Sequence, residues 1–200
     1  MAILSSLDRL LRPWHLAIVN AVAIVWFVTL TLASRAALPG VALFRCPIGF
    51  CAGGYSPEEL YSMLDEIGED GRGYLYGTLL WADLVLPALL TAALLANILW
   101  FSRPGTRGAV TLRPAARLGL LAVPLVYCVA DYAENWAIAN LLQLYPNIDD
   151  LMAERASVLT AAKSQLVAAS IGIVAALAVA GVASLGNRSE PGSRSPGDEA

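Results

Sequence analysis

Apolar residues gather into four long stretches of the chain that contain almost no charge. The stretches lie between Arg12 and Arg35, Arg72 and Arg103, Arg117 and Asp149, and Arg155 and Arg188. Each is longer than the roughly 20 residues that a helix needs to cross about 30 Å of hydrocarbon. Only helices and closed barrels satisfy backbone groups in lipid, so we expect an all-α fold. The predicted architecture is a polytopic membrane four-helix bundle with spans at about 14–34, 74–101, 116–145 and 156–185.

The first connection contains a further predicted element. Within the loop at 35–73, the segment at about 57–67 places Leu60, Met63, Leu64 and Ile67 on one helical face. Ser56 and Glu59 have the spacing of a capping box, and Gly68 suits the helix end. We therefore expect a short amphipathic helix in this loop. Residues 1–185 form the predicted transmembrane domain, and the Gly-, Ser- and Pro-rich residues 186–200 form a predicted disordered tail.

Composition agrees with a membrane protein. The chain is 58% hydrophobic and only 14% charged, whereas soluble domains are about 45–50% apolar and about 25% charged. The net charge of −3 argues against nucleic acid as a partner, so the expected partner is the lipid bilayer. There is no P-loop or dinucleotide fingerprint, and the single histidine excludes a multi-histidine metal site. We expect no cofactor and no metal.

Arginine placement predicts the orientation. Four arginines and no acid lie between Ser102 and Arg117, whereas the connections at 35–73 and 146–155 are net acidic. Positively charged loops stay on the cytoplasmic side. We therefore expect a multi-pass protein of the bacterial cytoplasmic (inner) membrane with both termini cytoplasmic and both acidic loops facing outward.

Four ionisable residues lie inside the predicted spans, and they are the candidate site. They are Asp83, Asp131, Glu134 and Lys163. Each costs about 2.5–3.5 kcal/mol at a helix centre, and such residues usually mark function. Asn135 and Tyr127 share the helical face of Asp131. A rise of about 1.5 Å per residue places charges from three spans at similar depths in the outer half of the bundle. We expect one polar cluster there, reachable from the outer side.

Several functions fit such a cluster. With three acids and one lysine, we prefer binding of a small amphiphile, a cation or a proton without covalent chemistry. One alternative is a membrane enzyme that acts on a lipid-like substrate with Asp131 or Glu134 as acid or base. Another is a structural or assembly protein in which the charges only fasten the helices. Lys163 could instead extend to the outer interface, which would leave a purely acidic cluster.

Proline should distort the helix beside one of these acids. Pro87 has no N–H for the carbonyl of Asp83, four residues earlier, so we expect a kink and a freed acceptor there.

Cysteines and small residues complete the candidate features. Cys46 and Cys51 fall in the outward loop, where an oxidising environment would allow a disulfide. Cys128, inside the third span, is expected to be a packing residue. The fourth span repeats a small residue every four positions, at Ala168, Gly172, Ala176, Ala180 and Ser184. Such a row allows close helix packing, either within the bundle or in a homo-oligomer.

Overall fold

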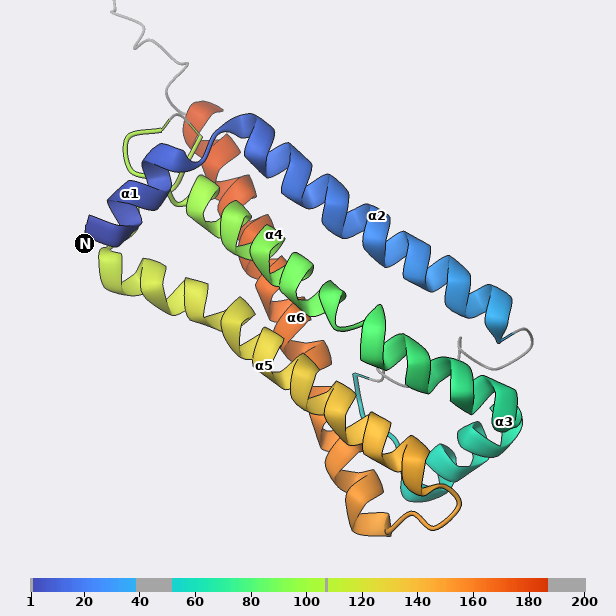
Figure 1. The fold of residues 1–200 in the computed structure, drawn as a ribbon. Helices are drawn as coiled ribbons and strands as arrows, with labels where there is room; N and C mark the ends of the chain where they lie inside the picture. The colour runs from blue at the N-terminus through green and yellow to red at the C-terminus, as the bar shows by residue number, and fades with distance from the viewer. Residues whose placement is uncertain (1, 39–51, 107, 187–200) are drawn as a thin grey trace, which may run out of the picture.

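The fold is built from α-helices. The computed structural model describes residues 2–38, 52–106 and 108–186, and all regular elements within these ranges are helical. They are α1 (Ala2–Leu10), α2 (Pro13–Ala37), α3 (Pro57–Trp81), α4 (Val85–Phe101), α5 (Pro114–Leu144) and α6 (Asp150–Gly186). In Figure 1, α4 lies between α2 and the α5–α6 pair, with α3 at one end and α1 at the other. The predicted all-α class is confirmed.

Three of the four predicted spans are single helices that are long and apolar enough to cross a membrane. They are α2, α5 and the part of α6 from Asp150 to Leu185. The apolar part of the second predicted span is divided, and its helix α4 has 17 residues. Helices of this length and composition suggest an integral membrane protein.

The predicted capping box at the start of α3 is present. The Glu59 N–H donates to Ser56 Oγ over 3.2 Å, and the Ser56 N–H donates to the Glu59 carboxylate over 2.8 Å. Gly68 takes φ 67°, which ends the first part of the helix as expected. The expected loop between Gly68 and residue 74 is wrong, because helix continues directly to Trp81. A single left-handed glycine redirects the chain, so no connecting residues are needed.

The second predicted span is interrupted at residues 82–84. The Asp83 N–H donates to the carbonyl of Thr78, five residues earlier, instead of the usual four. Pro87 provides no N–H for the Asp83 carbonyl, so the regular ladder cannot resume until the break has passed. The span predicted at 74–101 therefore consists of the end of α3 and the whole of α4, with Asp83 in the break between them.

Neighbouring helices satisfy the carbonyls exposed by this break. Trp26 Nε1 of α2 donates to the Ala82 carbonyl over 3.1 Å. Tyr132 Oη of α5 donates to the Leu84 carbonyl over 2.9 Å. Irregular backbone at membrane depth requires such partners, because lipid offers none. The break is therefore held by side chains from both sides.

The helices differ in how deeply they are packed. α5 and α6 pack along each other, α4 packs on both, and α2 packs mainly on α4 (Figure 1). Only Ala23 of α2 is buried. The Asn97 side chain donates to Asn20 Oδ1 over 2.8 Å, so an amide pair joins α4 to α2. α2 is thus a peripheral helix fixed by a few polar contacts.

A buried ion pair ties α1 to the bundle, and the sequence did not predict α1. Arg117 is buried at the start of α5 and pairs with Asp8 of α1. Arg117 Nε also donates to Ser102 Oγ over 2.9 Å, and its Nη2 donates to the Leu99 carbonyl over 3.1 Å. We name this end, with α1 and the α4–α5 loop, the arginine end. The opposite end, with α3 and the α5–α6 turn, is the acidic end.

The small-residue row of α6 lies largely on the surface. Ala168, Gly172, Ala176 and Ala180 are exposed, so internal packing of this row is wrong. The buried glycine of α6 is Gly181, which lies against the backbone of Gly108 in the α4–α5 loop. A Cβ built at Gly181 would meet the Gly108 carbonyl oxygen at 2.0 Å, whereas a Cβ at Gly172 meets nothing within 4 Å.

We expect Gly181→Ala to destabilise the protein and Gly172→Ala to leave it unchanged or slightly more stable. Overpacking of this kind costs about 1–3 kcal/mol, whereas Gly→Ala in an open helix position gains up to about 1 kcal/mol. Thermal unfolding in detergent, followed by circular dichroism, measures both. Equal midpoints for the two variants would contradict the close approach of Gly181 to Gly108.

Candidate functional site

One face of α5 supplies most of the candidate side chains. Tyr127, Asp131, Glu134 and Asn135 are all buried, and Glu134 is 0% exposed. Spacings of three and four residues place them on the side of α5 that faces the bundle. The Tyr127 hydroxyl donates to Asp131 Oδ2 over 2.6 Å. The polar side chains therefore point away from lipid.

α6 brings a cation and a hydroxyl to the same place. Lys163 Nζ donates to Asp131 Oδ1 over 2.9 Å and also forms an ion pair with Glu134. Thr160 Oγ1 donates to Glu134 Oε1 over 2.5 Å. Lys163 is only 8% exposed, so the alternative in which it extends to the outer interface is wrong. The ammonium pairs with two carboxylates inside the bundle, and this pairing takes the place of an extended side chain that would reach water at the interface.

The break before α4 adds the third acid. Asp83 lies within electrostatic range of Lys163, Asp131 and Glu134, and it approaches the side chain of Asn135. Among the described residues Asp83 forms no direct ion pair. Asn135 is 4% exposed, and neither of its side-chain polar atoms has a hydrogen-bond partner of regular geometry in the described ranges. The structure thus places a carboxylate beside a buried amide that is not otherwise used.

These side chains form a group that we name the polar cluster. Its members are Asp83, Tyr127, Asp131, Glu134, Asn135, Thr160 and Lys163. All six ligand-binding candidates from the sequence come together in it, from α5, α6 and the break before α4. Thr160 was not predicted, although its position one helical turn before Lys163 would have indicated the same face.

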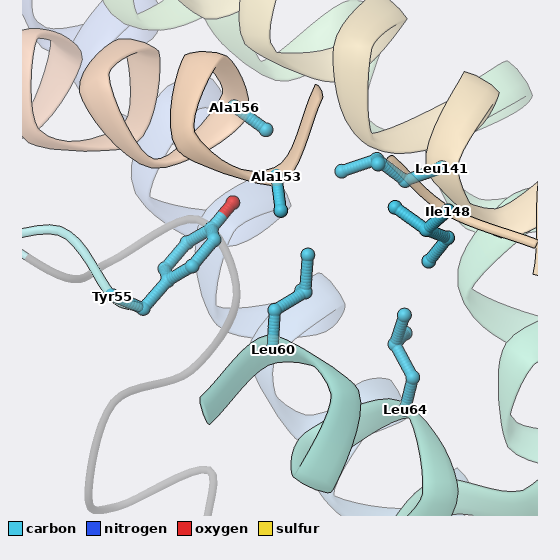
Figure 2. Close-up of a cluster of buried hydrophobic side chains, with 7 residues drawn as sticks. All are labelled: Tyr55, Leu60, Leu64, Leu141, Ile148, Ala153 and Ala156. Carbon is cyan, nitrogen blue, oxygen red and sulfur yellow. The ribbon is translucent and has the colours of Figure 1, made fainter. Parts of the chain in front are cut away.

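An apolar layer covers the polar cluster at the acidic end. Its buried members are Tyr55, Leu60, Leu64, Leu141, Ile148, Ala153 and Ala156 (Figure 2). Leu141 follows Glu134 by about two helical turns along α5, and Ala156 precedes Thr160 by about one turn along α6. The described residues therefore separate the polar cluster from the end that the sequence analysis places outside.

Tyr55 of this layer reaches toward the polar cluster and was missed by the sequence analysis. Figure 2 shows its ring beside Leu60, with the hydroxyl directed toward α6. The hydroxyl is buried, approaches Thr160 and lies within electrostatic range of Glu134 and Lys163. Burial raises the pKa of Tyr55 to about 12, although Thr160 acts in the opposite direction. The phenol is thus a neutral donor at physiological pH.

The charges of the polar cluster do not balance. Lys163 is the only lysine in the chain, and it faces three carboxylates. It is placed directly between Asp131 and Glu134, each of which also accepts from a hydroxyl. No hydroxyl of the described residues donates to Asp83 in the same way. If all three acids are ionised, they and Lys163 leave two negative charges, so the arrangement has room for a further positive charge.

Other candidates give a simpler result. Cys46 and Cys51 lie outside the described residues, so their disulfide stays a prediction. Cys128 is a free, partly buried cysteine of α5. Within the described ranges no group of three or more His, Cys, Asp or Glu side chains has the geometry to hold a metal ion.

Comparison with protein-family models, with curated proteins and with solved structures finds no match for this chain. The polar cluster is therefore the feature of the molecule that bears on its function.

We expect Lys163→Met to destabilise the protein strongly. The change leaves Asp131 and Glu134 buried together without their cation, and breaking a buried pair from one side costs about 3–5 kcal/mol. Arg155→Met is the matched control, because Arg155 is an exposed cation on the same helix. Unfolding midpoints in detergent measure both variants. A similar loss for Arg155→Met would argue that the effect does not arise from the polar cluster.

Proposed function

We propose that this chain is an integral membrane protein that binds a small positively charged species in the polar cluster, with Asp83 as the receiving residue. The species is a proton, an alkali cation or the ammonium group of a small amphiphile. All three would neutralise one of the two negative charges that the three carboxylates and Lys163 leave uncompensated. The binding involves no covalent chemistry.

The division of donors among the three acids is the observation that supports this proposal. Asp131 accepts from Tyr127 and Lys163, and Glu134 accepts from Thr160 while it pairs with Lys163. Asp83 forms no direct ion pair within the described residues; the neutral amide of Asn135 lies beside it, and Lys163 acts on it only from a distance. A carboxylate in a low-dielectric surrounding is costly unless it is paired or neutralised. A bound proton or cation at Asp83 removes that cost.

We further propose that the chain crosses a bacterial inner membrane four times, with its termini in the cytoplasm. The interrupted span that ends with α4 would be one of the four crossings. The arginine end would face the cytoplasm and the acidic end would face outward, as the positive-inside rule predicts. The polar cluster would then lie nearer to the outer face.

A second candidate function is purely structural, and the direct pairing of Lys163 supports it. Lys163 connects two carboxylates of α5 to α6, which is the contact expected of a cluster that only fastens helices. The two candidates differ in what they predict for Asp83. A fastening role needs no added positive charge there.

We expect the wild-type protein to be stabilised by its ligand, and Asp83→Asn to abolish this effect without unfolding the protein. A ligand at 100 times its Kd stabilises by about 2.7 kcal/mol. Unfolding midpoints are measured with Na⁺, K⁺ or methylammonium against choline at constant ionic strength. For the proton, infrared difference spectra between mildly acidic and neutral pH should show a protonated carboxyl band that is absent from Asp83→Asn.

Glu154→Gln is the matched control, since Glu154 is an exposed acid on α6. It should retain the cation-dependent midpoint and the carboxyl band of the wild-type protein. A wild-type protein that shows neither response would overturn the binding proposal and leave the structural role. Equal losses in Glu154→Gln and Asp83→Asn would also overturn the assignment to Asp83.

A further inference from the structure

A short segment before α3 lies directly on α6 above the polar cluster. The Tyr55 N–H donates to Ser157 Oγ over 2.8 Å. Gly54 has φ +76°, and a Cβ built there would meet Ser157 Oγ at 2.5 Å. Only glycine combines this backbone conformation with so close an approach. We name residues Gly54–Ser56 the strap.

The Tyr55 ring fills the space between the strap and the polar cluster. The residue is 8% exposed, and its ring packs among Leu60, Ala153 and Ala156 (Figure 2). Its hydroxyl is buried without a hydrogen-bond partner of regular geometry among the described residues. Ring burial favours the closed position, whereas the unpaired hydroxyl opposes it. The two effects therefore act in opposite directions on the closed position of the strap.

The helix that follows is anchored independently of the strap. The Tyr61 hydroxyl donates to the Ile148 carbonyl, and the Tyr145 hydroxyl donates to Asp65. The Arg72 guanidinium lies 4.3 Å from the centre of the Tyr145 ring. These contacts join α3 to the α5–α6 turn without the strap. Displacing Tyr55 therefore leaves the rest of the acidic end in place.

We infer that Tyr55 is the gate of the polar cluster at the acidic end, and that its displacement admits the small cationic species from that side. This inference rests on the proposed function. Tyr55 in its closed position supplies a ring that excludes water and a neutral hydroxyl beside Thr160 and Glu134. Opening should expose Glu134 before Asp131, because Glu134 is the closer of the two α5 carboxylates to the apolar layer.

Access to Glu134 is measured with a water-soluble carbodiimide and an amine at mildly acidic pH, followed by peptide mass spectrometry. We expect slow labelling in the wild-type protein and about tenfold faster labelling in Tyr55→Ala, a factor that corresponds to about 1.4 kcal/mol of lost closure. Gly54→Ala should act in the same direction, because its Cβ pushes the strap away from Ser157. Tyr55→Phe keeps the ring and removes the hydroxyl that opposes closure, so its labelling should be no faster than that of the wild-type protein.

Tyr61→Ala is the matched control, since Tyr61 is a tyrosine of the same end that packs against the apolar layer and whose hydroxyl donates to the Ile148 carbonyl. An equal increase in Tyr61→Ala would overturn the gate, because the effect would then be general loosening. Unchanged labelling in both Tyr55→Ala and Gly54→Ala would also overturn it. Labelling does not require that a cation binds, so the gate and the proposed function can fail separately.

Discussion

The ammonium of Lys163 is the contact on which the central part of the bundle depends. It joins α6 to two carboxylates of α5, at 2.9 Å from Asp131 and in an ion pair with Glu134. Without it, two buried negative charges would face each other in a medium that screens them weakly. The register of α5 against α6 is therefore set by charge as well as by packing. This register places Thr160 of α6 within hydrogen-bond distance of Glu134, whereas the bond from Tyr127 to Asp131 lies within α5.

Local sequence patterns predicted this pair of helices well, because the relevant spacings lie within single helices. Asp131, Glu134 and Asn135 share a face by helical geometry alone. The interruption beside Asp83 was predictable as a kink, since the missing N–H of Pro87 is a local feature. Its extent over residues 82–84 depends on Trp26 and distant α5 contacts, which no local pattern contains.

The parts that sequence analysis missed depend on contacts between distant residues. Tyr55 and Ser157 are 102 positions apart, and nothing near Tyr55 indicates that its hydroxyl approaches a charged cluster. Likewise, α1 gains its place through Asp8 and Arg117, which are 109 positions apart. The arginine-counting rule treats Arg117 as a loop charge, although it is buried. Such contacts appear only once the helices are placed.

The two buried ionic groups in the part of the chain that the structure describes differ in a way that bears on function. At the arginine end, Arg117 faces one acid, and Ser102 and the Leu99 carbonyl accept its remaining hydrogen bonds. In this group one cation pairs with one acid, and the remaining donors of the cation have acceptors. The polar cluster instead holds more carboxylates than cations and leaves the amide of Asn135 unused among the described residues. Because every buried charge costs free energy, an extra acid such as Asp83 is a burden to a purely structural cluster. The imbalance therefore favours a cluster that exchanges positive charge with its surroundings over one that only joins helices.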